Sequence, residues 1–135
     1  EAPALVVATL RTYMNDSGGP TKSLADFFKI PAERIIVAHD ELDIPFSAIR
    51  MKRGGGDNGH NGLKSITQSL GTGEYYRIRL GIGRPPGLQD PGDFVLKPFN
   101  SSERAELSDF LSRAVAATEV LIKKGLSVAQ QEFNS

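Results

Sequence analysis

A glycine-rich loop at residues 54–62 is the part of the sequence best suited to hold a ligand. It runs Gly-Gly-Gly-Asp-Asn-Gly-His-Asn-Gly, with five glycines in nine positions, so its backbone N–H groups are barely shielded. The run 63–70 that follows is spaced as a helix, and Gly71 is expected to end it. Unpaired N–H groups and the helix dipole both favour an anion at such a helix start. His60 and Asn61 lie there, so the loop predicts an anion site beside an imidazole and an amide.

Two further polar clusters follow segments with the composition of β-strands. Asn15 lies in a turn after the apolar run 5–10, and His-Asp-Glu-Leu-Asp at 39–43 follows the apolar run 35–38. Ligands of open α/β sheets bind at the carboxyl ends of strands, where we expect these clusters to converge with the glycine loop. An aspartate–histidine pair could then activate water, while amides hold the water or a carbonyl oxygen. Each cluster alone could equally be a capped or solvated turn.

Other chemistries find little support in the composition. The chain has no cysteine and only two histidines, so it can form no disulfide or thiolate site, and a metal would need several carboxylates. No Gly-x-Ser-x-Gly motif occurs that would suggest a serine nucleophile. We therefore expect no metal and no cofactor. The absence of cysteine favours the cytoplasm, and no apolar run approaches the ~20 residues that span a bilayer.

The glycine loop also fits the dinucleotide-binding pattern Gly-x-Gly-x-x-Gly formally. Gly54, Gly56 and Gly59 match it, and Glu74 lies twenty residues after Gly54. The context disagrees, because the preceding strand at 49–53 carries three basic residues instead of being apolar. A nucleotide-binding oxidoreductase domain is therefore a weak alternative.

The net charge of zero conceals a basic block around the loop. Residues 50–84 carry seven Lys or Arg against two Asp or Glu, whereas the flanking segments 1–49 and 85–135 carry net charges of −3 and −2. A local excess of +5 suits a partner that bears phosphate.

The chain as a whole is predicted to form one α/β domain over residues 1–135, with a mixed twisted sheet flanked by helices. The expected strands are 5–10 (buried), 35–38, 49–53 (one face basic and wet) and 77–83. The arginines of 77–83 are expected to lie beside the basic residues of 49–53. The expected helices are 20–29, 63–70, 101–124 and 127–133, and 84–93 is expected to be a loop. The apolar stripe of the longest helix is assigned to Leu107, Phe110, Leu111, Ala114 and Leu121.

Four blocks of the sequence resemble bacterial-type peptidyl-tRNA hydrolases in wording, order and spacing, across nearly the whole chain. They are Tyr-Met-Asn-Asp-Ser-Gly at 13–18, Ala-His-Asp-Glu-Leu-Asp-Ile-Pro at 38–45, the block 54–63, and Leu-Gly-Thr at 70–72 with 77–84. The blocks at 38–45 and 54–63 are together very specific. The resemblance implies a monomeric, metal-free enzyme that cleaves the ester joining a peptide to the terminal ribose of tRNA, and so releases tRNA from stalled translation products.

The same resemblance assigns roles to individual residues. Asn15 would orient the catalytic water and the peptide end of the substrate, and Asp40 would hold a catalytic histidine in the correct tautomer. Asn61 would bind substrate near the ester, with His60 at the rim of the channel. The full set of substrate-binding residues implied is Tyr13, Met14, Asn15, Gly59, His60 and Asn61.

Lys52 and Arg79 match the pair that the family uses to clamp the 5′-phosphate of tRNA. This role fits the basic block, because a charge-assisted clamp suits a phosphate. The implied partner is therefore the acceptor stem of peptidyl-tRNA with its 5′-phosphate.

The sequence departs from the family pattern in two ways. Asn58 replaces the usual glycine, which Asn can do because it tolerates left-handed backbone angles. The family's opening strand and its Arg-His-Asn segment, whose histidine is the catalytic base, are missing. We therefore expect an N-terminally truncated chain with negligible hydrolysis, in which neither His39 nor His60 replaces the base. Its open sheet edge could drive self-association. The alternative is a truncated relative that binds tRNA without catalysis.

Overall fold

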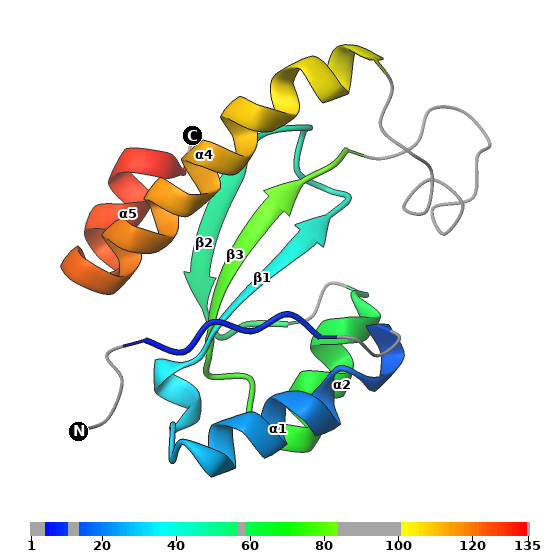
Figure 1. The fold of residues 1–135 in the computed structure, drawn as a ribbon, viewed down its shortest axis with the longest axis vertical. Helices are drawn as coiled ribbons and strands as arrows, with labels where there is room; N and C mark the ends of the chain where they lie inside the picture. The colour runs from blue at the N-terminus through cyan, green and yellow to red at the C-terminus, as the bar shows by residue number, and fades with distance from the viewer. Residues whose placement is uncertain (1–4, 11–13, 57–58, 84–100, 135) are drawn as a thin grey trace. The chain divides into compact units, whose positions relative to one another are not determined.

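The computed structural model describes residues 5–10, 14–56, 59–83 and 101–134 (Figure 1). The chain divides into two compact units. Unit 1 comprises residues 1–35 and 55–74, and unit 2 comprises residues 36–54 and 75–135. None of the helices in these described stretches is long and apolar enough to cross a membrane.

Unit 2 is built on a three-stranded mixed sheet. Its strands are β1 (Ile36–Glu41), β2 (Ile49–Arg53) and β3 (Tyr76–Gly81), in the order β1-β3-β2. β1 runs parallel to β3, and β2 runs antiparallel to it. The expectation of a mixed sheet is thereby confirmed.

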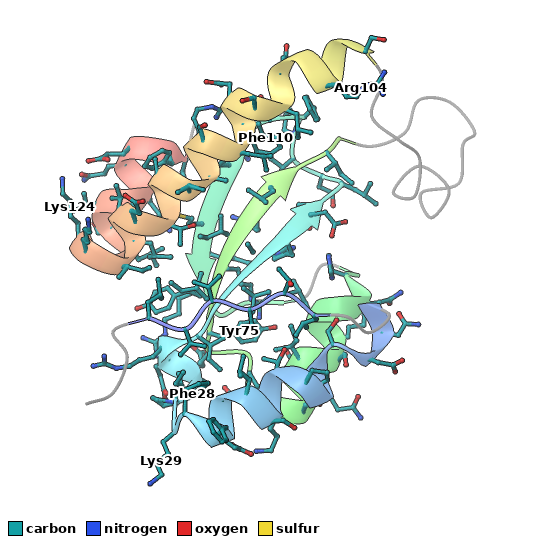
Figure 2. All side chains as sticks on the ribbon, viewed as in Figure 1. Phe28, Lys29, Tyr75, Arg104, Phe110 and Lys124 are labelled. Atoms are coloured by element: carbon teal, nitrogen blue, oxygen red, sulfur yellow. The ribbon has the colours of Figure 1, made fainter. Side chains whose placement is uncertain are left out.

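Two helices cover the apolar face of this sheet. α4 (Ser101–Lys124) and α5 (Leu126–Phe133) lie almost as predicted, with Gly125 between them. The residues that form the shared core are Ile49, Met51, Ile78, Phe110, Ala117, Leu121 and Ala129. Figure 2 shows Phe110 directed from α4 towards the strands. Leu111, which was expected in the apolar stripe, is 53% exposed, because it is one position past the core-facing row of the helix.

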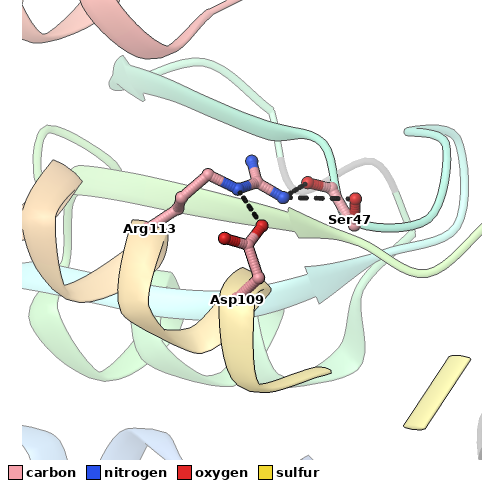
Figure 3. Close-up of polar contacts among 3 residues, drawn as sticks. All are labelled: Ser47, Asp109 and Arg113. Atoms are coloured by element: carbon pink, nitrogen blue, oxygen red, sulfur yellow. Dashed lines mark hydrogen bonds and ion pairs between the residues drawn. The ribbon is translucent and has the colours of Figure 1, made fainter. Parts of the chain in front are cut away.

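A salt-bridged arginine fastens α4 to the turn that precedes β2 (Figure 3). Arg113 Nη2 donates to the carbonyl oxygen and the hydroxyl of Ser47, at 2.8 Å and 3.2 Å, and its Nε donates to Asp109 at 3.1 Å. Ser47 has a φ of 69°, in the left-handed region that is unfavourable for a residue with a Cβ. The arginine therefore stabilises an otherwise disfavoured turn, and the turn sets where β2 begins.

Unit 1 packs two short helices against each other. α1 (Gly18–Phe27) contacts α2 (Asn61–Leu70), and the 3₁₀ turn η1 (Met14–Asp16) contacts both. A second 3₁₀ turn, η2 (Ala32–Arg34), precedes the chain's entry into β1. α2 ends at Gly71, whose φ of 75° is the left-handed cap that the sequence predicted.

Gly18 is the closest approach between the two helices of unit 1. Its N–H donates to the Ser65 hydroxyl at 2.8 Å. A Cβ at Gly18 would overlap the Ser65 carbonyl oxygen and the Ser69 hydroxyl, whereas a Cβ at the neighbouring Gly19 would meet nothing. Only glycine therefore allows α1, and η1 before it, to lie this close to α2.

Two expectations from the sequence are wrong. Residues 5–10 form no strand, and Val7 is 82% exposed. β-rich composition yields a strand only where the backbone finds a partner, and among the described residues the sheet contains only β1, β3 and β2. The strand predicted at 35–38 instead runs to Glu41, because pairing with β3 continues to Gly81. The loop predicted at 84–93 lies outside the described residues.

Substitution of the two adjacent glycines of α1 should have opposite effects. Gly18→Ala should lower the free energy of unfolding by about 2–3 kcal/mol, because the added methyl group overlaps backbone atoms of α2. Gly19→Ala is the matched control and should stabilise the protein by about 0.5–1 kcal/mol, because alanine favours the helix. Chemical denaturation measures both, and equal effects at the two positions would contradict this packing.

Candidate functional site

Four basic side chains project from one face of the β2–β3 pair. In the antiparallel register Arg50 lies opposite Arg79, and Lys52 lies opposite Arg77. Alternate residues of a strand share a face, so all four lie on the face opposite Met51 and Ile78. We call these four residues the basic face. The predicted alignment of the basic residues of the two strands is confirmed.

The basic face is only partly wet, which corrects the expectation from sequence. Arg77 is 1% exposed, and its guanidinium carbon lies 4.5 Å from the centre of the Tyr75 ring. Glu41 of β1 is also buried, at 5% exposure. Among the described residues, nothing accepts a hydrogen bond from the buried Nε of Arg79. An arginine donor that has lost its water without gaining an acceptor is suited to bind an anion.

The electrostatics of the basic face follow from this crowding. Burial, with repulsion from Arg79 and Arg77, lowers the pKa of Lys52, and attraction to Glu41 opposes the change. Burial also lowers the pKa of Arg79, against the opposing effect of Glu41, and Arg50 and Arg77 add to the decrease. In both groups burial and repulsion outweigh the attraction to Glu41, and an added anion would favour the charged forms.

The polar residues of β1 lie within the strand and not in a turn after it. His39 is buried, and its Nδ1 donates to the carbonyl oxygen of Asp40 at 2.8 Å. Asp40 is half-buried and lies opposite Leu80 of β3. The alternation of the strand places Asp40 on the opposite face from His39 and Glu41. His39 is thus held by its own strand, and Asp40 occupies the last position but one of β1.

Unit 1 carries the remaining predicted site residues. Asn15 is exposed in η1, which contacts α2, and Asn61 is the exposed first residue of α2. His60 is the N-cap of α2, where its Nδ1 accepts the Leu63 N–H at 3.2 Å. Gly59, with a φ of 79°, supplies the left-handed turn before it.

Some predicted site residues are described incompletely or not at all. Tyr13 and Asn58 lie outside the described residues, and only the backbone of Met14 is described. Within unit 1, Asn15 and Asn61 lie on η1 and α2, which contact each other. Within unit 2, Lys52 and Arg79 lie on the adjacent strands β2 and β3. Convergence of the unit 1 residues with Asp40 stays a prediction.

No group of three His, Asp or Glu side chains that could hold a metal occurs in the described part of the chain.

Two residues at the basic face, Arg77 and Glu41, were not predicted from the sequence as site residues. Arg77 is two residues from Arg79 in an alternating strand, so its face was predictable, whereas its burial was not. Glu41 was assigned to an acidic turn, and only the length of β1 places it beside the basic face.

The sequence and the fold of this chain match those of known proteins. The model of the family described as "Peptidyl-tRNA hydrolase" matches residues 2–135. The peptidyl-tRNA hydrolase of Kineococcus radiotolerans is 52% identical over 98% of this chain and 67% of its own length. That of Frankia casuarinae is 55% identical over 96% of this chain and 66% of its own length. The crystal structure of peptidyl-tRNA hydrolase from Acinetobacter baumannii superposes with a TM-score of 0.82 at 34% identity, covering 92% of this chain and 63% of that one.

The chain belongs to the peptidyl-tRNA hydrolase family, as the sequence predicted. It spans about two thirds of the length of the curated relatives that it matches. The expectations of a truncated family domain and of an inactive chain are not supported, because the family model matches residues 2–135.

The capping role of His60 should be separable from any role in binding. His60→Ala should lower the free energy of unfolding by about 1 kcal/mol, because the Leu63 N–H at the start of α2 loses its acceptor. His60→Asn should stay within a few tenths of a kcal/mol of the wild type, because asparagine is a preferred N-cap. Thermal unfolding followed by circular dichroism measures both. An alanine variant as stable as the asparagine variant would show that the contact contributes nothing.

Proposed function

We propose that the protein hydrolyses the ester between peptide and tRNA in peptidyl-tRNA, and that the basic face binds the 5′-phosphate of the acceptor stem. The activity is supported by membership of the family and by the names of relatives more than half identical to this chain. The observation that carries the phosphate site is the buried Nε of Arg79, which has no acceptor among the described residues and lies on the strand next to that of the like-charged Lys52. A monomer in the cytoplasm is the state we expect for this function.

The phosphate clamp would work through geometry as much as through charge. Lys52 and Arg79 lie on neighbouring strands, diagonally across the register, so two donors reach one face from different directions. Burial lowers the pKa of both cations, and the charge of Arg79 adds to the decrease at Lys52. A phosphate bound between them would remove that repulsion and accept the hydrogen bond that Arg79 Nε lacks.

The remaining residues would act on the ester itself. We assign Asn15 to orienting the attacking water, and Asn61, with His60 and Gly59, to holding the substrate near the ester. Asp40 would orient the histidine that acts as general base. The ring of His39 donates to the backbone of its own strand, and that of His60 caps α2, so neither is arranged as this base.

The phosphate clamp is tested with two acceptor-stem minihelices that differ only in a 5′-phosphate or a 5′-hydroxyl. The wild type should bind the phosphorylated RNA more tightly. Lys52→Met and Arg79→Met should each weaken that binding by about tenfold, because each removes a charge-assisted contact, with little effect on the hydroxylated RNA. Fluorescence anisotropy at one fixed salt concentration gives the six dissociation constants.

Lys124→Met is the matched control for the clamp, because Lys124 is an exposed lysine of the same unit at the far end of α4 (Figure 2). It should leave the preference for the 5′-phosphate unchanged. Equal losses for both RNAs, or a loss in the control as large as that in Lys52→Met, would show general charge attraction in place of a phosphate site.

Hydrolysis is measured as release of tRNA from peptidyl-tRNA carrying a labelled peptide. We expect turnover, and we expect Asp40→Asn to lower it by ~10²–10⁴-fold, because Asp40 is the group assigned to orient the general base. His39→Gln and His60→Asn should each lower it far less, because one ring is bonded to its own strand and the other caps α2. Unchanged turnover in Asp40→Asn would contradict the role of Asp40, and turnover abolished by His60→Asn would make His60 the base.

A further inference from the structure

Two amide side chains at the C-terminal end of α5 bind the backbone of β2 at a single residue. Asn134 Oδ1 accepts the Met51 N–H at 2.8 Å, and the Met51 carbonyl oxygen accepts from Gln130 Nε2 at 3.0 Å and from Asn134 Nδ2 at 3.3 Å. Gln130 lies in the last turn of α5, and Asn134 is the capping residue that follows the helix, four positions further on. All three bonds are partly buried.

Met51 is the residue of β2 where such a contact has most effect. It is the middle residue of the strand, its side chain is fully buried in the core, and it lies opposite Ile78. β2 is an edge of the sheet that the described residues form, so within this sheet the backbone groups that point away from β3 have no strand to bond. The two amides satisfy both backbone groups of Met51 and occupy the place that another strand would take.

The neighbours of Met51 give this contact a functional meaning. Arg50 and Lys52 flank it, and both lie opposite arginines of β3. Like charges directly across an antiparallel pair destabilise the pairing, so the basic face tends to push β2 away from β3. The bonds from α5 oppose this tendency at the residue between the two cations.

We propose that Gln130 and Asn134 are positioning residues that hold β2 in place, so that Lys52 is presented for phosphate binding. The proposal rests on the proposed function, since it assigns the two amides an effect through the clamp. The amides touch no substrate. They act on the strand backbone, and loss of either lets the end of β2 that bears Lys52 move relative to Arg79.

The test measures the ratio of dissociation constants for the 5′-hydroxyl and 5′-phosphate minihelices in Gln130→Ala and Asn134→Ala. The ratio should fall about 2- to 10-fold in each, as the loss of one or two hydrogen bonds allows. Gln131→Ala is the matched control, because Gln131 is the exposed neighbour of the same type on the same helix, and it should keep the wild-type ratio. Gln130→Ala removes only one of the three bonds, which makes it the variant of choice if Asn134→Ala fails to fold.

A Lys52→Met background distinguishes a positioning role from a merely structural one. In that background Gln130→Ala should reduce the ratio no further, because the group that it positions is already absent. A further fall in that background would overturn the positioning role. So would wild-type ratios in Gln130→Ala and Asn134→Ala, if Lys52→Met lowers the ratio. Either result would leave the clamp intact. A wild-type ratio in Lys52→Met itself would overturn the clamp and the positioning role together.

Discussion

The pairing of β2 with β3 is the constraint on which unit 2 depends, because it must hold like charges together on one face. Cross-strand pairs of like charge oppose the pairing by up to about 1 kcal/mol each. The opposite face carries Ile49, Met51 and Ile78, each at most 1% exposed. Full burial of such a side chain contributes roughly 1.5–3 kcal/mol, so the apolar face outweighs the repulsion. The charged face of the sheet is thus stabilised by the core behind it.

The two C-terminal helices supply that core and also contact β2 at its start and at its middle. α4 contributes Phe110, Ala117 and Leu121 to the apolar layer, and Arg113 holds the turn at Ser47 before the strand. α5 contributes Ala129, and Gln130 and Asn134 at its C-terminal end bond to the strand's middle residue. Because β2 is short, these contacts add to its ladder with β3 in holding the strand. Helices that carry no predicted site residue therefore support the strand that bears Lys52.

What could be predicted from the sequence is what depends on local periodicity. The alternation in 49–53 and 77–83 was sufficient to place the basic residues on one face of two neighbouring strands, and the glycine at 71 was sufficient to end a helix. Which strands pair is not a local property. Residues 5–10 were predicted as a buried strand from their composition, but this segment pairs with no strand of the described residues. The same limit hid the burial of Arg77 and the amides of α5, since both depend on segments distant in the sequence. The motif residues were identified by resemblance, which supplies roles without geometry.

His60 is a motif residue that the fold itself uses. Its Nδ1 accepts the Leu63 N–H, so the neutral ring must carry its proton on Nε2. Asparagine, aspartate and serine would satisfy the same helix start, so capping alone does not require an imidazole. The cap fixes the orientation of the ring at the start of α2, next to Asn61. The substrate-binding role that we propose for His60 and Asn61 would depend on a ring held in this way, because preorganised polar groups bind a developing charge best.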